Sequence, residues 1–395
     1  MRRIQVCARP GWRDLAERVG FVTHTLLGEP YWWEEHYYAF EASALERDVD
    51  AAVVALGEMC DAVVERAVVD DEILRSLHIP EPWWDRVAQS WRGRDPALVA
   101  RFDLAYDGGG DAAMLEVNAD TPGMAFEWGV VQWLWLEDAL AAGHVPPGSD
   151  QHDRLHAELV DRFRSIAAGH ALLHFAASHR NVEDRVAAND LRDCAEQAGC
   201  ATEFVAVEDL GVDRDGRITD LQDRLVTMLV KVYRWALLIR EPFADALRAP
   251  AAPEIVEPSW KLILSSKGVM AWLWRLFPGH PNLVPTWFAD DTAASPGADY
   301  VTKPLRSVKG ANVRIVARAL PGGTAESDGP YGLEPRIVQA YRPLPTFRDE
   351  RGHVVHAQVG AWAVAGRPAG IGVVEGDGPI ITQDASRFLP HVILP

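Results

Sequence analysis

The segment RFDLAYDGGGDAAMLEVN (residues 101–118) constrains the fold most, because two apolar runs flank a triple-glycine turn. This pattern predicts a β-hairpin. Residues two positions apart in a strand lie on the same face. Glu116 and Asn118 therefore share one face, and Arg101 and Asp103 share a face of the partner strand. A polar pair on an otherwise apolar strand indicates either a ligand site or an internally hydrogen-bonded pair.

Folding the hairpin about its central glycine places Asp103 opposite residue 115, within about one position of Glu116. Asp103, Glu116 and Asn118 then form a cluster of oxygen ligands with Arg101 at its rim. Such a cluster suits Mg²⁺, which binds a few protein groups together with phosphate oxygens. The alternative is a surface hairpin whose polar side chains are solvated.

A second segment, YVTKPLRSVKGANVRIV (residues 300–316), combines a predicted strand with a basic, glycine-containing loop. Its polar candidates are Lys303, Arg306, Lys309, Gly310 and Asn312. Such a loop can fold backbone N–H and ammonium groups over phosphates. It is not a P-loop, because GxxxxGK[ST] is absent. The alternative is an exposed hairpin with ordinary lysines.

Two further features fit a nucleotide. Lys267 precedes a predicted helix, where a phosphate would be favoured. RIVQAYRPLP (residues 336–345) predicts a strand leading into a turn that could enclose and hydrogen-bond an adenine, with Gln339 and Leu344 as the expected contacts. HExxH, GxSxG and GxGxxG motifs are absent, so those metal, hydrolase and dinucleotide sites are not indicated.

The composition is that of a globular protein, with 48% hydrophobic and 24% charged residues among 395. The apolar runs are too short to span a membrane. A net charge of −18 argues against nucleic acid and is compatible with a cationic partner such as a polyamine, or with solubility alone. Four cysteines without CxxC spacing and an N-terminus without an apolar segment predict a cytoplasmic protein. Most of the fifteen tryptophans are expected in the core or in pocket walls. Exposed ones could line a pocket or an interface equally, so the oligomeric state is open.

The hydrophobic spacing predicts an α/β (α+β) protein. Helices are expected at 12–27, 39–68, 153–168, 184–198 and 260–276, and late strands at 356–364, 368–375 and 379–382. Linkers near 144–150 and 247–258 divide the chain into three expected parts. These are N-terminal helices with the hairpin (1–148), an α/β substrate-binding subdomain (149–255) and a nucleotide-binding subdomain (256–395).

Many ordered blocks together carry a resemblance to a known family: GEPYW, QSW, LEVNADTP, QWLWLED, EPSWKLILSSK, KPLRSVKGANV, IVQAYRPLP, AGIGV and ITQDASRFLPH. The chain resembles the synthetase part of glutathionylspermidine synthases, which are ATP-grasp carboxylate–amine ligases. It is most similar to stand-alone bacterial relatives that lack the amidase domain. The resemblance implies an ATP-grasp fold and ATP and Mg²⁺ as cofactors.

The resemblance also implies roles for individual residues. Asp103, Glu116 and Asn118 match Mg²⁺ ligands, and Arg101 matches an arginine that meets the transferring phosphate. Lys267 and Lys303 match lysines on the nucleotide phosphates. Lys309, Gly310 and Asn312 would belong to a phosphate-covering loop, and Thr121 would hold the peptide substrate.

The implied reaction joins a small-molecule or peptide carboxylate to an amine. The carboxylate attacks the γ-phosphate of ATP to give an acyl phosphate and ADP, and the amine then displaces phosphate. Catalysis by positioning and charge neutralisation needs no enzyme nucleophile. A cationic amine needs an acidic, aromatic pocket, for which Glu127 and Asp384 are the expected residues.

The sequence departs from the family pattern at two positions. A catalytic arginine of the family is missing after AGIGV, where the chain reads Val373-Val374-Glu375, and Arg306 is the expected substitute. Gly123 lacks a hydroxyl that the bifunctional enzymes use for their peptide. Two alternatives therefore remain beside the ligase: a non-catalytic homologue that binds ATP or a polyamine, and a kinase-like or nucleotidyl-transfer enzyme.

Overall fold

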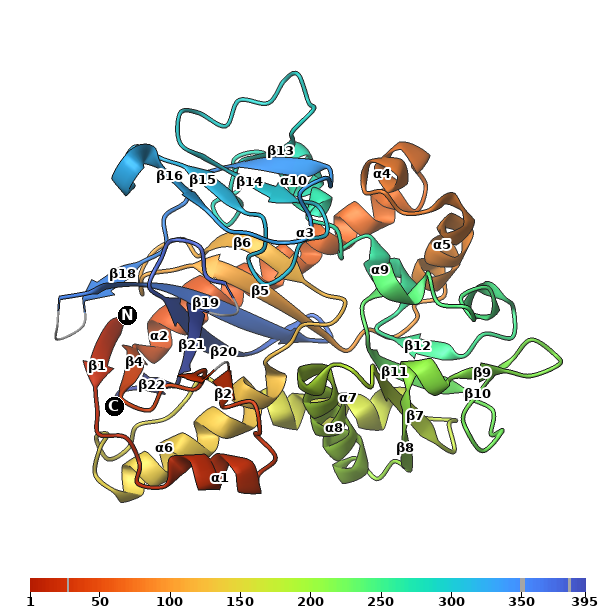
Figure 1. Cartoon of the computed structure of the whole chain (residues 1–395), viewed down its shortest axis with the longest axis horizontal. Helices are drawn as coiled ribbons and strands as arrows, with labels where there is room; N and C mark the ends of the chain where they lie inside the picture. The colour runs from red at the N-terminus through yellow and green to blue at the C-terminus, as the bar shows by residue number, and fades with distance from the viewer. Residues whose placement is uncertain (27, 349–351, 383–384) are drawn as a thin grey trace.

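Three larger β-sheets, with helices packed around them, form the molecule in the computed structural model (Figure 1). The structure describes residues 1–26, 28–348, 352–382 and 385–395. Helices follow one another between residues 42 and 92, helices and strands are mixed between residues 155 and 276, and the described chain from residue 286 onward is mostly strands, which fits the expected α/β (α+β) class. No helix among these described residues has the length and apolar character needed to cross a membrane.

The first sheet has six strands and contains the predicted hairpin. Its order is β21-β20-β19-β5-β6, and β18 pairs with β19 at one end. The strands are β5 (Val99–Ala105), β6 (Ala113–Asn118), β18 (Thr346–Arg348), β19 (Val354–Val364), β20 (Arg367–Gly376) and β21 (Ser386–Leu389). The hairpin therefore shares a sheet with strands from the C-terminal end of the chain.

Both faces of this sheet are covered. Val359 and Ala361 of β19 belong to the hydrophobic core that includes α3 (Ala51–Ala67). Trp362, on the opposite face, packs in a second core with Trp128 and Trp135. Arg101 pairs with Trp362 across β5 and β19, so the polar residues of β5 lie on the Trp362 face.

The second sheet is parallel and has the order β12-β11-β7-β8. Its strands are β7 (Leu173–Ala177), β8 (Thr202–Ala206), β11 (Met228–Val232) and β12 (Glu254–Val256). Two helices, α7 (Leu155–Ile166) and α8 (Val182–Gln197), pack on one another beside it. β7 and β11 are buried along their whole lengths, as expected for parallel strands between covering layers.

The third sheet is antiparallel, with the order β13-β17-β14-β15-β16. Its strands are β13 (Thr286–Phe288), β14 (Tyr300–Pro304), β15 (Arg314–Val316), β16 (Thr324–Glu326) and β17 (Arg336–Ala340), and α10 (Gly268–Leu276) packs against it. The segment before β13 is tied to the hairpin, because the Met114 amide donates to the Asn282 carbonyl at 2.8 Å and the Asn282 side chain donates to the Ala112 carbonyl at 2.9 Å. This attachment brings the nucleotide candidates of the third sheet to β6.

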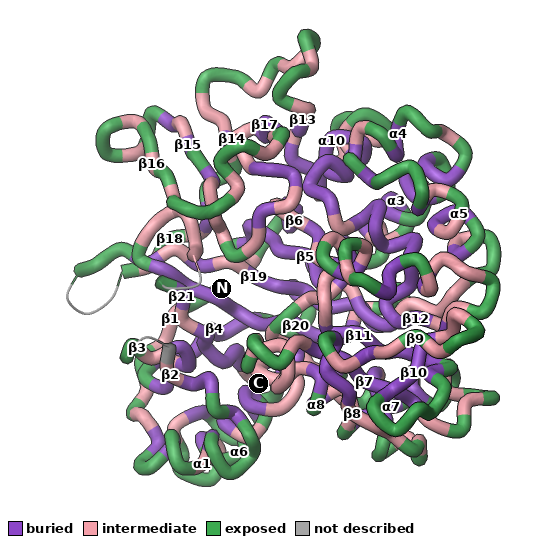
Figure 2. The backbone as a smooth tube through the Cα atoms, turned by 45° about the vertical axis from the view of Figure 1, so that its right-hand side comes forward, coloured by how far each residue is buried: buried purple, intermediate pink, exposed green. Residues whose placement is uncertain are grey.

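Smaller elements complete the described chain. The two ends of the chain meet in a three-stranded sheet, β1-β4-β22, and β2–β3 and β9–β10 are separate pairs. Their bounds are β1 (Arg2–Gln5), β2 (Thr25–Leu26), β3 (Glu29–Pro30), β4 (His36–Phe40), β9 (Gly211–Val212), β10 (Ile218–Thr219) and β22 (His391–Ile393). The other α-helices are α1 (Trp12–Arg18), α2 (Ala42–Ala44), α4 (Asp71–Ser76), α5 (Trp84–Arg92), α6 (Gln132–Ala141) and α9 (Trp235–Leu238). Figure 2 shows the interior strands as buried and the outer loops as exposed.

Four of the expected elements are wrong in extent. The helix expected at 260–276 begins at Gly268, because residues 259–262 form a separate 3-10 turn. The helix expected at 12–27 ends at Arg18, since Gly20 adopts φ 86°, a left-handed value that ends helices. The helix expected from residue 39 begins at Ala42, because residues 36–40 are taken by β4. No strand forms at 379–382; β21 follows at 386–389 instead. The three-part domain division stays a proposal, and the six-stranded sheet joins its first and third parts.

Candidate active site

The hairpin gathers the four predicted polar residues on one face. Arg101 lies opposite Asn118, and Asp103 lies opposite Glu116. The predicted partner of Asp103, residue 115, is therefore wrong by one position, because the register shifts between Asp103 and Leu104. Figure 1 shows β5 and β6 between the second and third sheets.

Asp103 is the centre of a hydrogen-bonded group. The Arg101 guanidinium donates to both Asp103 oxygens, at 2.7 and 3.0 Å, and the Asn118 amide donates to Asp103 Oδ2 at 2.9 Å. Arg101 also donates to the Gly123 carbonyl at 2.8 Å. The bidentate pair fixes the guanidinium plane, since two parallel hydrogen bonds set its orientation.

Two lysines from the third part of the chain reach the same hairpin. Lys267 Nζ lies 2.5 Å from Glu116 Oε1 and 2.7 Å from the Ser307 carbonyl. Lys303 Nζ donates to the Leu115 carbonyl and to Gln339 Oε1, both at 2.9 Å. The structure thus brings the predicted metal residues and the predicted phosphate lysines together.

The charges of this cluster shift one another's pKa values. Burial tends to raise the pKa of Glu116, but Lys267, Lys303 and Arg101 outweigh it, so the pKa is lowered. Burial lowers the pKa of Lys303 to about 8, against the attraction of Glu116 and with the repulsion of Lys267. Glu116 is therefore an ionised carboxylate and Lys303 a destabilised cation, which an incoming anion would favour.

Trp128 supports Arg101 from a slot that the sequence reasoning missed. The guanidinium carbon lies 5.6 Å from the centroid of Trp128 and 6.0 Å from that of Trp362. The indole of Trp128 lies against two paired glycines, Gly360 and Gly372, where an added Cβ would lie 2.3 and 2.0 Å from ring atoms. The signal available in the sequence was the Gly-x-Gly alternation in AGIGV, which keeps one face of β20 free of side chains.

The predicted phosphate loop contacts Lys267 through the Ser307 carbonyl and extends to α8. Lys309 and Gly310 have φ values of 56° and 72°, and Lys309 Nζ lies 2.6 Å from Glu183 of α8. Asn312 accepts a hydrogen bond from the Tyr331 amide at 2.7 Å. The Arg306 guanidinium donates to the His78 carbonyl at 2.5 Å, so in this conformation it does not join the hairpin cluster.

The remaining substrate and nucleotide candidates each have their own surroundings. Thr121 lines a small cavity of about 30 Å³ with Asp120 and Lys231. Glu127 accepts a hydrogen bond from Tyr31 at 3.4 Å, and burial raises its pKa to about 7. Leu344 is buried after β17. The predicted residue Asp384 lies outside the described residues.

The structure shows what surrounds Val374, the position where the resemblance implies a catalytic arginine. Val374 is buried on the Trp362 face of β20, opposite Gln358 and Phe388. The carboxylate of its neighbour Glu375 accepts hydrogen bonds from the Arg3 guanidinium at 2.9 Å and from the Tyr38 hydroxyl at 2.6 Å. Among the described residues of this β20 segment, no cation takes the place of the arginine.

The comparisons with known proteins decide the family. A family model described as glutathionylspermidine synthase preATP-grasp matches residues 3–394. The chain belongs to this family. A Haemophilus influenzae protein provisionally named an acid–amine ligase is 31% identical over 98% of both chains.

The bifunctional glutathionylspermidine synthetase/amidase of Escherichia coli is 25% identical, over 93% of this chain and 60% of the relative's length. The trypanothione synthetase of Crithidia fasciculata is 26% identical over 82% of this chain and 51% of its own length. The chain thus spans about half to three-fifths of these two relatives. The predicted family and its class, the ATP-dependent amide-forming ligases, are confirmed.

A solved structure confirms the predicted ATP-grasp type of fold. A glutathione-synthetase-like effector of Globodera pallida superimposes with a TM-score of 0.56 over 91% of this chain and 89% of that chain. The two sequences are 13% identical, so this likeness concerns the fold alone.

Proposed function

We propose that the protein joins the carboxylate of a peptide or amino acid to an amine at the hairpin site, with ATP activating the carboxylate. The observation that carries this proposal is the meeting of Asp103 and Glu116 with Lys267 and Lys303. Two carboxylates beside two cations can together bind ATP with its magnesium ion. The metal takes the carboxylates, and the phosphates take the lysines.

The oxygen donors of the hairpin fit Mg²⁺. Asp103, Glu116 and Asn118 offer two carboxylates and an amide oxygen on one face, and Mg²⁺ selects such oxygen ligands while keeping waters and phosphate oxygens. These three residues would hold the ion, which would neutralise the charge of the transferring phosphate. Asp103 would exchange its present hydrogen bonds for the metal.

The cations act on the phosphate. The Lys267 and Lys303 ammonium groups would leave Glu116 and Gln339 for the nucleotide phosphates, and Arg101 would meet the oxygen charge that develops on the acyl phosphate. Lys309, Gly310 and Asn312 would cover the phosphates from the loop, and Gln339 and Leu344 would border the adenine.

The substrates would occupy the side of the hairpin that faces α8. Thr121 is proposed to hold the carboxylate substrate, since it lies three residues after the end of β6, the strand that carries Glu116 and Asn118. Glu127 is proposed for the amine. A partly buried carboxyl whose pKa is about 7 can exchange a proton with an attacking amine near neutrality.

One observation favours a second candidate, a non-catalytic homologue that binds ATP or a polyamine. Val374 replaces the family arginine, and the expected substitute Arg306 donates to the His78 carbonyl. For the ligase reaction, the loop would have to move so that Arg306 reaches the phosphate and substitutes for the implied arginine.

The deciding experiment measures ADP release from ATP with Mg²⁺ against a mixed panel of peptides and polyamines. The variants are Glu116→Gln in the site and Glu137→Gln, an exposed control on α6. A ligase releases ADP only when a carboxylate and an amine are both present, and the release disappears in Glu116→Gln alone. ATP binding without ADP under every substrate pair selects the non-catalytic candidate.

We also propose that this reaction takes place in the cytoplasm. All four cysteines are free thiols, which suits a reducing compartment that supplies ATP.

A further inference from the structure

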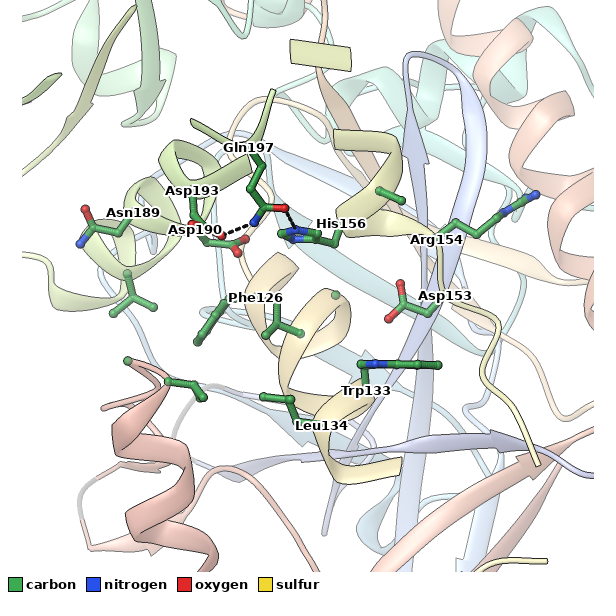
Figure 3. A pocket seen from close by; sticks show the side chains of 16 residues that line it. Phe126, Trp133, Leu134, Asp153, Arg154, His156, Asn189, Asp190, Asp193 and Gln197 are labelled. Atoms are coloured by element: carbon green, nitrogen blue, oxygen red, sulfur yellow. Dashed lines mark hydrogen bonds between the residues drawn. The ribbon is translucent and has the colours of Figure 1, made fainter. Parts of the chain in front are cut away.

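A cavity lies between α6, α7 and α8, and its lining is separate from the residues of the hairpin cluster. Its volume is about 740 Å³, and Phe126 and Trp133 form part of its apolar lining. Figure 3 shows His156, Asp190, Asp193 and Gln197 gathered on one wall of it. None of these four residues has a role in the proposed ligase reaction.

Three different ligand types meet at this wall. The carboxylate of Asp190, the imidazole of His156 and the thiol of Cys194 offer ligand atoms that all lie within 4.8 Å of one another. Asp190 and Cys194 are four residues apart on α8, so they share one face of that helix, and His156 comes from α7. We propose that His156, Asp190 and Cys194 form a binding site for a divalent ion of the zinc type.

The distances suit tetrahedral coordination. Zinc bonds of about 2.3 Å to sulfur and 2.0–2.1 Å to nitrogen at a tetrahedral angle place the two atoms about 3.6 Å apart. His156 Nδ1 and Cys194 Sγ are 3.5 Å apart. An imidazole and a thiolate select zinc-type ions over Mg²⁺, which takes oxygen ligands.

Asp190 supplies an independent indication. Its side chain is 8% exposed, and no hydrogen bond or ion pair reaches its carboxylate from the part of the chain that the structure describes. Burial and the nearby charges of Glu127 and Asp193 raise its pKa to about 7. A buried carboxyl group without a protein partner is costly, and a cation would satisfy it.

The ring of His156 is held in the orientation that a ligand needs. Gln197 donates its amide to Asp193 at 2.7 Å, which turns the Gln197 oxygen toward His156 Nε2 at 3.2 Å (Figure 3). Nε2 then carries the ring proton, and the Nδ1 lone pair faces Cys194. Metal-bound histidines characteristically donate their second nitrogen to such a partner.

The same surroundings argue against Cys194 as a nucleophile. The side chain has no exposed surface, and burial together with Asp190 and Asp193 raises the pKa of its thiol. The thiol therefore remains protonated until a metal displaces its proton. Three protein ligands leave a fourth position on the cavity side, where a water or a small ligand can bind.

Metal titration of the full chain tests this site. The metal-free protein is titrated with Zn²⁺ by calorimetry in excess Mg²⁺, which occupies oxygen-only sites, and separately with Co²⁺ by absorption spectroscopy. We expect one tight Zn²⁺ equivalent and a thiolate-to-cobalt charge-transfer band. His156→Gln and Cys194→Ser should weaken Zn²⁺ binding at least tenfold, and Cys194→Ser should remove the band.

Matched controls are His144→Gln and Cys200→Ser, which change the same residue types outside the cluster and should keep both signals. Gln197→Leu should weaken affinity by about 10- to 100-fold through loss of the orienting hydrogen bond. If the buried Cys194→Ser variant does not fold, His156→Gln on the partly exposed residue decides. No cobalt–thiolate band in the wild type, or unchanged Zn²⁺ affinity in His156→Gln, overturns the proposal, and neither result depends on ligase activity.

Discussion

Lys267 Nζ lies 2.5 Å from Glu116 Oε1, so one ion pair joins residues 151 positions apart at the start of a helix and on a strand. Glu116→Gln leaves Lys267 and Lys303 facing each other without their shared counter-charge. Because the Glu116 side chain is 26% exposed, we expect a loss of about 1–3 kcal/mol in the free energy of unfolding, below the 3–5 kcal/mol of a fully buried pair. Urea unfolding of wild type and Glu116→Gln without nucleotide measures this loss.

The same variant tests whether the ATP phosphates and the Glu116 carboxylate bind the same two lysines. ATP without Mg²⁺ supplies phosphate charge in place of the lost carboxylate, so it should raise the melting temperature of Glu116→Gln more than that of the wild type. Glu137→Gln should behave as wild type. Equal shifts in all three proteins would show that the phosphates do not reach these lysines.

The pKa of Lys303, lowered to about 8, predicts a pH dependence of stability. In the unfolded chain this lysine keeps its proton to its usual pKa of 10.5. Between pH 8 and 10.5 the unfolded state therefore binds more protons, and the contribution of Lys303 to stability rises with pH. Relative to Lys303→Met, which does not titrate there, the wild type should gain unfolding free energy from pH 7.5 to 9.5.

Nucleotide binding should show the opposite trend, because only the protonated lysine attracts phosphate. ATP affinity should fall over the same range in the wild type and stay flat in Lys303→Met. A parallel decline in both proteins would assign the titration to another group.

The Trp128 slot predicts a strong effect of a small substitution. Gly372→Ala places a Cβ about 2 Å from the indole, so Trp128 must move and Arg101 loses its support. We expect a loss of about 1–3 kcal/mol in stability, as for other overpacked cores, together with reduced ADP release.

Gly57→Ala in α3 is the control. Its Cβ would meet no atom within 4 Å, and it should stabilise the helix by about 0.5–1 kcal/mol. Thermal unfolding of both variants tests the pair, and an unchanged Gly372→Ala would refute the slot.

Local patterns predicted the hairpin, and long-range packing determined what they could not. The triple glycine and the alternation around it place Asp103 and Glu116 on facing strands, but the register shift beside Asp103 moves the pairing by one residue. No local signal marks β4 as the partner of β1 and β22, because short strands from the two chain ends meet there. The glycines of AGIGV are visible in the sequence, whereas Trp128, which fills the space above them, comes from a different segment. The roles of the site residues stay predictions.

Asp120, at the end of LEVNAD, connects the hairpin to the parallel sheet. Its carboxylate accepts from Lys231 Nζ of β11 at 2.5 Å and from the Trp235 amide at 2.7 Å, and the Lys231 side chain has no exposed surface. Removing one partner leaves a buried charge, so Lys231→Met should cost about 3–5 kcal/mol. Adding Asp120→Asn to that variant should recover part of the loss, because the amide can still pair with Trp235 without a buried charge.

The half-exposed pair Arg192–Glu196 on α8 is the reference for this comparison. Glu196→Gln should change stability by less than about 1 kcal/mol, since half-exposed pairs are screened by water. Guanidinium unfolding of Lys231→Met, Asp120→Asn, the double variant and Glu196→Gln, with wild type as reference, gives the values. Losses that simply add in the double variant would show that Asp120 and Lys231 are not coupled and that the hairpin is attached to the parallel sheet by other contacts.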